Sequence, residues 1–226
     1  MTHDWTALLA TATDRFARLT AEADPTAPVA SCPGWTVADL VDHVGGVHQW
    51  ARHAIVAGTP DGQAESPSLG ADAAALASWY AGHAGALRDA LAGDPTASAW
   101  TFGTEQTAGW WLRRQVHETT MHTRDLLDAA GRVDEWILDP GLAWDGVREV
   151  ATEFYPRQVR LGRTEPLPGT LRLVATDLAI DPVVLGDATP EVELAAPAAE
   201  VLLMVWKRRT AEDPAAAALL ALPVTP

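Results

Sequence analysis

The sequence predicts an α+β protein, with a four-helix bundle followed by a smaller α/β domain. In the first half, apolar side chains recur at helical spacing in four segments that Pro- and Gly-containing loops separate. Beyond residue 135, short stretches alternate between apolar and polar residues, as half-buried strands do. With 226 residues, 48% of them hydrophobic, the chain can bury one large core or two small ones. We place the bundle at residues 1–134 and the second domain at 135–226.

The four helices of the bundle are expected over residues 4–22, 37–57, 71–91 and 108–129. The first carries Trp5, Phe16 and Leu19 on one face. The second follows a Pro-Gly turn, and Thr36 is a suitable residue to cap its first turn. Because the connections between the helices are short or of medium length, the four segments should pack as a bundle.

The second domain should open with a helix and continue with strands. Asp139 and Pro140 are typical of a helix start, and this helix is expected to reach about Tyr155. Alternating or β-branched stretches predict strands, and Ala-rich or amphipathic stretches predict two further helices. The expected strands span residues 170–177, 183–185 and 191–194, and the expected helices span 198–209 and 211–222.

Charge and composition exclude several classes of function. The net charge of −14 repels phosphate backbones and anionic lipids, so we expect neither nucleic acid nor a membrane surface as partner. No apolar run approaches the roughly 20 residues that span a bilayer. The single cysteine, Cys32, excludes an internal disulfide and a cysteine-based zinc site. The N-terminus lacks the features of a signal peptide, so we expect the protein in the cytoplasm.

The fourth predicted helix contains the motif QVHETTMH at residues 115–122. It resembles the HExxH signature of zinc proteases but has one residue too many. His117 and His122 are five residues apart and diverge by roughly 140° around a helix, so they cannot bind one ion. Glu118 and His122 are four residues apart and lie within roughly 40° of each other. This carboxylate and this imidazole could therefore share a metal ion, provided that a third ligand comes from elsewhere.

His43 on the second helix is the best candidate for the third ligand. It follows Leu40 by three residues and precedes Val47 by four, so it lies on the apolar stripe that faces the bundle. Metal sites in helical bundles are built from facing helices. His48 lies roughly 140° away around the helix and cannot share that direction. Spacing alone also allows a plainer reading, in which His43 is a buried histidine that a neighbouring carbonyl satisfies.

Two motifs resemble a known family. The segment SCPGWTVADLVDH at residues 31–43, with VGGVH after it, and the segment from Arg114 to His122 are similar to signatures of the mycothiol-dependent maleylpyruvate isomerases. These proteins belong to the DinB-like metalloprotein superfamily. The resemblance implies a divalent metal ion, typically zinc, held by His43, Glu118 and His122. It also implies a sterol-carrier-like fold for the second domain and mycothiol as the thiol co-substrate.

The same resemblance suggests a catalytic residue in the second domain. The segment WKRR at residues 206–209 is similar to the closing helix of the family's second domain, and it implies that Arg208 serves catalysis. The cluster has a plainer explanation too, because cations at the end of a helix offset its dipole. Cys32 could be a packing residue or a reactive thiol. His48 and His117 could support the ligands, face solvent or have a capping role.

The function implied is a zinc-dependent thiol-transfer enzyme. It would act with mycothiol on a small electrophile, either as a cis–trans isomerase of the maleylpyruvate type or as an S-transferase. Two histidines and one carboxylate also describe the site of non-haem Fe(II) enzymes, which is one alternative. The other alternative is a protein that binds a small molecule without catalysis.

Overall fold

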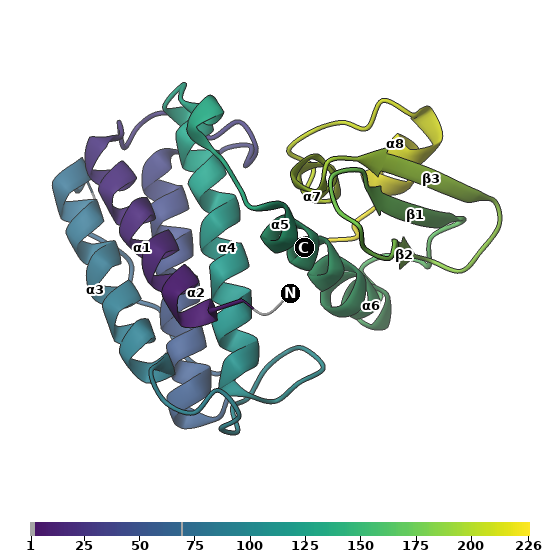
Figure 1. The fold of residues 1–226 in the computed structure, drawn as a ribbon. Helices are drawn as coiled ribbons and strands as arrows, with labels where there is room; N and C mark the ends of the chain where they lie inside the picture. Colours follow the sequence, from purple (N-terminus) through teal and green to yellow (C-terminus); the bar gives the residue numbers. More distant parts are fainter. Residues whose placement is uncertain (1–2, 69) are drawn as a thin grey trace. The chain divides into compact units, whose positions relative to one another are not determined.

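A computed structural model of the protein describes residues 3–68 and 70–226, which form two compact units. The first unit extends to Trp136 and the second comprises Ile137–Pro226. Figure 1 shows long helices in the first unit and a small sheet with shorter helices in the second. The α+β fold class predicted from the sequence is therefore confirmed. No helix among the described residues is long and apolar enough to cross a bilayer.

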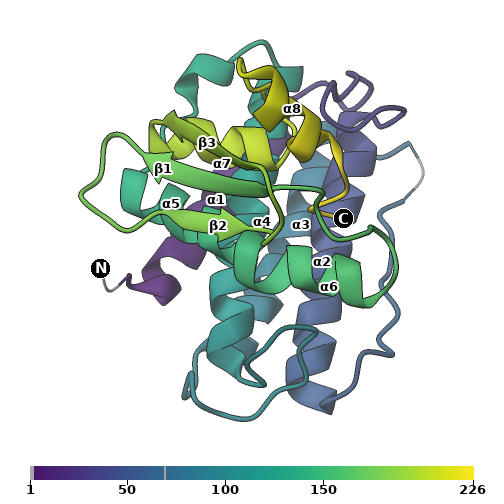
Figure 2. The ribbon, with the colours of Figure 1, turned by 90° about the vertical axis from the view of Figure 1, so that its right-hand side faces the viewer.

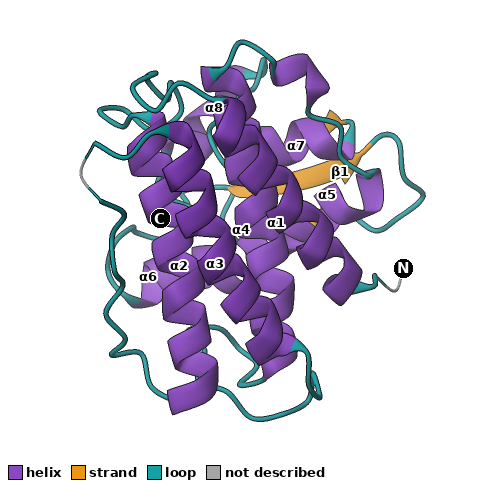
Figure 3. Ribbon diagram, turned by 90° about the vertical axis from the view of Figure 1, so that its left-hand side faces the viewer, coloured by secondary structure: helices purple, strands orange, loops and turns teal. Residues whose placement is uncertain are grey.

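The first unit is a bundle of four helices: α1 (Trp5–Glu22), α2 (Val37–Ala57), α3 (Ala73–Leu91) and α4 (Ala108–Ala129). Helix α1 packs against α3 and α4, and α2 packs against the same two helices. Figure 3 shows the four long helices running alongside one another. Their shared core is closed by large buried side chains that include Phe16, Leu40, Tyr80 and Leu126. Each helix thus buries the apolar stripe that its sequence predicts.

Side-chain caps fix where the four helices begin. The caps are Asp4, Thr36, Asp72 and Thr107, and each side chain accepts a hydrogen bond from a backbone N–H in the first turn. At Thr36 the cap is reciprocal, because the Asp39 carboxylate accepts from the Thr36 backbone N–H at 2.7 Å. Helix α2, which carries His43, therefore starts at the residue that the Pro-Gly turn predicts.

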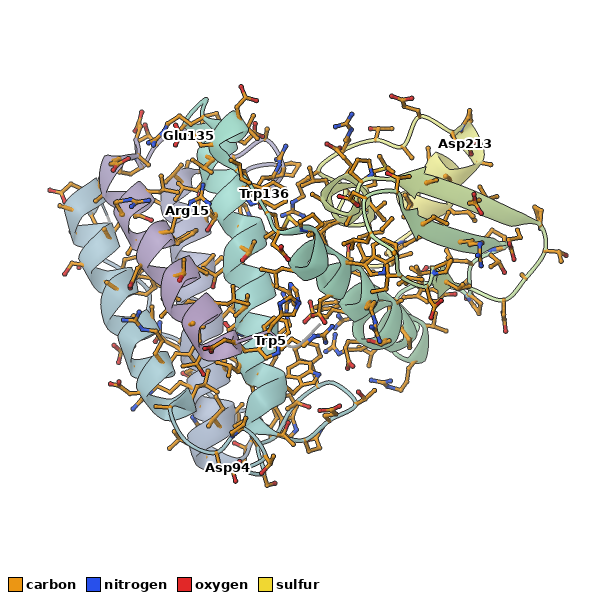
Figure 4. All side chains as sticks on the ribbon, in the orientation of Figure 1. Trp5, Arg15, Asp94, Glu135, Trp136 and Asp213 are labelled. Carbon is orange, nitrogen blue, oxygen red and sulfur yellow. The ribbon has the colours of Figure 1, made fainter. Side chains whose placement is uncertain are left out.

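The last residues of the first unit are fastened to the bundle. A short 3-10 helix, η1 (Val133–Glu135), follows α4. Arg15 donates to the backbone carbonyl of Glu135 at 2.6 Å, and the Trp136 indole donates to the carbonyl of Thr120 at 3.1 Å. Figure 4 labels Arg15, Glu135 and Trp136 around this end of the bundle. The contacts explain why the first unit extends to Trp136.

The second unit contains a three-stranded mixed sheet and four helices (Figure 2). The strands are β1 (Thr170–Ala175), β2 (Val183–Leu185) and β3 (Glu191–Ala196), in the order β2-β1-β3. Strand β1 pairs with β2 in antiparallel fashion and with β3 in parallel. Helices α7 (Ala198–Val205) and α8 (Pro214–Ala221) pack against strands of this sheet, and α5 (Pro140–Glu149) packs against α7.

Two helices of the second unit end at different residues from those predicted. The first does not stop near Tyr155 but continues from α5 through a π-helical turn (Val150–Phe154) into α6 (Tyr155–Arg160). The other, α7, ends at Val205 rather than at Arg209. It stops because Lys207 adopts a left-handed conformation with φ of 60°, which breaks the helical path. The backbone N–H of Arg208 then bonds to the carbonyl of Leu203 at 2.8 Å and closes the end of the helix.

Candidate metal centre

Helix α4 places Glu118 and His122 on one face, one turn apart. Thr107 caps the helix, and its 22 residues run without interruption to Ala129. Both side chains are buried: the residues are 9% and 8% exposed. The Nε2 atom of His122 lies 3.4 Å from Oε1 of Glu118. The regular helix therefore produces the carboxylate–imidazole pair that the four-residue spacing predicts.

The third predicted ligand, His43, reaches this pair from α2. Its Nε2 atom lies 3.2 Å from the same Glu118 oxygen. The rings of His43 and His122 meet edge to face, with centroids 5.0 Å apart. One donor atom from each of the three side chains lies within 4.8 Å of the other two. The structure thus brings the three residues together, and their role as metal ligands stays a prediction.

The carboxylate at the centre of this cluster is held in its charged form. Burial alone would raise the pKa of Glu118, but Arg114 and the two histidines outweigh this effect and hold the pKa well below its usual value. Arg114 lies one turn earlier on α4 and donates a hydrogen bond to the second carboxylate oxygen, Oε2. One oxygen of Glu118, Oε2, therefore accepts a hydrogen bond from Arg114, while the other, Oε1, faces both histidines.

His122 has a second polar neighbour that we did not predict from the sequence. Its Nδ1 atom lies 3.0 Å from Oδ2 of Asp125, which has no exposed surface. Burial opposes the charge on the imidazole, yet hydrogen bonds to Asp125 and Glu118 raise the pKa of His122 to about 9. The spacing could have revealed this pair, because residues three apart are neighbours on a helix.

Cys32 lies closer to the site than its position in the turn before α2 suggests. Its sulfur and one donor atom each of His122 and Asp125 lie within 4.8 Å of one another. The residue is partly exposed. Cys32 is not part of the group formed by His43, Glu118 and His122, so it remains outside the predicted ligand set. It nevertheless contributes to the surroundings of His122.

His48 is a core residue rather than one that faces solvent. It is completely buried, and its Nε2 atom lies 3.1 Å from the hydroxyl oxygen of Thr119. The Thr119 hydroxyl donates its single hydrogen to the carbonyl of Gln115 at 2.8 Å. His48 must therefore be the donor to Thr119. Burial lowers the pKa of His48 to about 3, which keeps the imidazole neutral.

His117 is also buried, at 7% exposure, and its ring packs on that of Trp5 with centroids 5.6 Å apart. Figure 4 labels Trp5 at the start of α1. His117 points away from Glu118 and His122 around α4, as five-residue spacing requires. This residue therefore joins α1 to α4, and it does not belong to the cluster that could hold a metal.

A cluster of aromatic rings fills the end of the bundle beyond the predicted metal site. Trp111 is completely buried, and its indole donates to the carbonyl of Trp100 at 2.6 Å. Gln115, one turn further along α4, is also completely buried, and neither polar atom of its side chain has a partner among the described residues. The cluster comprises Trp50, Trp100, Phe102, Trp110 and Trp111. The two adjacent tryptophans, Trp110 and Trp111, are therefore buried in the core of the bundle.

Arg208, the predicted catalytic residue of the second unit, follows the left-handed residue Lys207. Its guanidinium donates to the backbone carbonyl of Trp206 at 2.8 Å and lies 6.0 Å from the centre of the Trp206 ring. The neighbouring Arg209 is exposed and forms an ion pair with Glu200. The two arginines therefore have different surroundings, although they are adjacent in the sequence. A catalytic role for Arg208 stays a prediction.

Comparison with known proteins supports the resemblance seen in the motifs. Two solved structures share the fold over 89% of this chain and 87% of theirs. One is a mycothiol-dependent maleylpyruvate isomerase, at 16% identity and a TM-score of 0.63. The other is a histidine-to-alanine mutant of such an isomerase, at 14% identity and a TM-score of 0.65. No curated protein sequence matches the chain at a significant level.

The family assignment rests on the first unit. Residues 6–127 match the family described as the mycothiol maleylpyruvate isomerase N-terminal domain. This segment includes α2 and α3 and nearly all of α1 and α4, and with them His43, Glu118 and His122. Because the match spans more than half of the 226 residues, the protein belongs to the mycothiol maleylpyruvate isomerase family.

Proposed function

We propose that this protein is a zinc-dependent enzyme that uses mycothiol either to isomerise a small electrophile or, as an S-transferase, to attach the thiol to it through its sulfur. The main support is the meeting of His43, Glu118 and His122, whose donor atoms lie within 4.8 Å of one another in a member of this family. His43 is 75 residues from Glu118 in the sequence, so only the packing of α2 against α4 brings them together.

The donor set suits a catalytic zinc ion. Two imidazole nitrogens and one carboxylate oxygen are ordinary zinc ligands, and three protein ligands leave a coordination position open. An ion bound there would hold an incoming thiol as its thiolate, the nucleophilic form of sulfur. Glu118 and the two histidines would hold the ion, and Arg114 would keep Glu118 charged and fixed in orientation.

The isomerisation needs no net consumption of the thiol. Sulfur forms a bond to one carbon of a conjugated cis double bond, and the π electrons move to the neighbouring carbonyl as an enolate. The former double bond is now single and can rotate. Collapse of the enolate breaks the carbon–sulfur bond and restores the double bond in the trans geometry. In an S-transferase that adds the thiol, the carbon–sulfur bond would instead persist, and the enolate carbon would take up a proton to replace the one that the thiol released.

Arg208 is proposed to stabilise the charge that develops on the substrate. A guanidinium presents two parallel donors to a carboxylate or an enolate, and it stays charged at any working pH. Arg208 is half-buried beside Trp206, whereas Arg209 already pairs with Glu200. We assign the role to Arg208 and not to its neighbour because the segment 206–209 resembles the closing helix of the family's second domain.

The test is a thiol-transfer screen of the zinc-loaded protein. Mycothiol, bacillithiol and glutathione are offered with a set of cis-configured and other small electrophiles. We expect turnover with mycothiol and isomer formation or thioether formation as the product. His43→Ala should lose bound zinc and turnover together, whereas His53→Ala, on the same helix but hydrogen-bonded to Thr59, should keep both.

Two outcomes would contradict the proposal. Full zinc occupancy without turnover of any thiol would favour a protein that only binds a small molecule. Iron rather than zinc in protein that is expressed without added metal, with oxygen-dependent activity, would favour a non-haem iron enzyme. Elemental analysis of the purified protein, carried out beside the screen, separates these cases.

A further inference from the structure

Asp125 is a buried carboxylate that the proposed reaction does not use. It has no exposed surface, and a buried carboxylate is costly unless it is hydrogen-bonded or paired. Arg124 approaches it only to 3.8 Å, between Nη1 and Oδ1. The contact with His122 is closer, at 3.0 Å between Nδ1 and Oδ2. The imidazole of His122 is therefore a principal partner of this carboxylate.

The hydrogen bond determines which nitrogen of His122 remains available. When the Asp125 carboxylate is ionised it can only accept, and Nδ1 of His122 then carries the hydrogen of this contact. The other nitrogen, Nε2, faces the cluster and lies 3.4 Å from Oε1 of Glu118. If the ring turned by half a revolution, Asp125 would lose this hydrogen bond in a buried position. The carboxylate thus opposes the ring orientation in which Nδ1 would face the cluster.

We propose that Asp125 is the positioning residue of the metal centre: it orients His122 so that Nε2 is the metal-binding atom. Asp125 acts through His122 and does not itself touch the ion. This inference rests on the proposed function, because it assumes that His122 is a ligand. Carboxylates that accept from a metal-bound histidine are a general feature of metal sites, and losing one typically weakens metal binding 10- to 100-fold.

Two measurements on the full-length protein test this role. The first is zinc affinity by competition with a chelator, for which we expect Asp125→Ala to bind about 10- to 100-fold more weakly than the wild type. Asp125→Asn retains a carbonyl acceptor and should lose less. Asp128→Ala is the matched control, because it removes a partly exposed carboxylate one turn away that pairs with Arg124. Its affinity should equal that of the wild type.

The second measurement does not need metal. In the metal-free protein, the His122 Nδ1 hydrogen should exchange slowly with water, and NMR should detect it in the wild type, in Asp125→Asn and in Asp128→Ala. It should be lost in Asp125→Ala. Circular dichroism of each variant establishes that the fold persists. A merely structural role for Asp125 would lower stability without altering the ring hydrogen or the affinity of the folded protein.

The outcomes separate the two proposals. If Asp125→Ala keeps the slowly exchanging hydrogen, or binds zinc as tightly as the wild type, the positioning role is overturned. If instead the wild type and His122→Ala bind zinc equally well, the proposed metal centre fails. In that case Asp125 cannot position a metal ligand either. The NMR comparison still decides whether Asp125 orients the His122 ring.

Discussion

The bundle and the second unit differ in how they hold their polar residues. In the bundle, a single helix, α4, carries four buried ionisable side chains that are tied to one another: Arg114, Glu118, His122 and Asp125. In the second unit, Arg208 sits beyond the end of α7, in a turn that depends on one left-handed residue. A regular helix converts sequence spacing into direction, whereas a turn does not. The positions of polar side chains could therefore be predicted from the sequence in the bundle but not in the second unit.

The largest expected effect concerns Arg208, and it would show that both units contribute to the reaction. Arg208→Ala should lower turnover by orders of magnitude with zinc content unchanged, because the developing negative charge loses its guanidinium partner. Steady-state kinetics and elemental analysis on the same samples measure the two quantities. Arg209→Ala is the matched control and should have a smaller effect, since Arg209 is engaged with Glu200. If neither variant lowered turnover, the proposed chemistry would be restricted to the bundle, and equally large losses in both would remove the distinction between Arg208 and Arg209.

Much of the bundle could be predicted because its helices are long and capped. The spacing of Glu118 and His122 and the apolar neighbours of His43 made these three residues candidates for one site, and the resemblance of two motifs to the isomerase family implied them as the ligand set. The surroundings of His48 could not be predicted, because they depend on Thr119, a residue 71 positions away. Nor could spacing show that Gln115 is buried without a partner among the described residues.

In the second unit, the strands were predicted and the helix ends were not. The alternation of apolar residues in β1 follows from burial of one face of the sheet, and it is visible in the sequence. The end of α7 depends on Lys207, and a lysine is not a residue that marks a left-handed turn. The π-helical turn at Val150–Phe154 lies just before Pro156, whose missing backbone N–H interrupts the regular hydrogen bonding of a helix.

The pH dependence of stability tests the buried polar core of the bundle. Because burial lowers the pKa of His48 to about 3, folded His48 stays neutral where an unfolded histidine is already protonated. Below about pH 6.5, the free energy of unfolding should therefore fall by roughly 1.4 kcal/mol per pH unit from this residue, and above that pH it should contribute no slope. Denaturant unfolding between pH 4.5 and 7.5 measures the slope. His48→Asn should show a correspondingly shallower one, and identical slopes would contradict the burial argument.

A smaller effect is expected at the turn after α7. Lys207→Gly should raise the free energy of unfolding by up to about 1 kcal/mol, because glycine adopts the left-handed conformation without the steric cost of a side chain. The lost hydrogen bond from Lys207 Nζ to Ala221, 3.3 Å long and exposed, offsets part of this gain. Lys207→Ala retains a Cβ atom and serves as control. Thermal unfolding compares the two variants, and a more stable alanine variant would be the contrary result.

The smallest effect is expected at Cys32. Cys32→Ser should retain most of the turnover, because the nucleophilic sulfur of the proposed reaction arrives with mycothiol. The position of Cys32 beside His122 and Asp125 makes the variant informative, since a serine hydroxyl keeps a donor and an acceptor near the same groups. The rate with mycothiol is the measurement. Loss of turnover with zinc content and fold intact would identify Cys32 as the nucleophile.

The sheet of the second unit has a consequence for how the protein behaves at high concentration. Among the described residues, β3 pairs with β1 alone, so it is an edge strand of the sheet. Such edges promote self-association and aggregation. Glu191 and Glu193 are exposed along this strand. Glu193 pairs with Arg172 of β1 at 3.4 Å, so Glu191 is the acidic residue of this strand that would oppose a second copy approaching by the same edge.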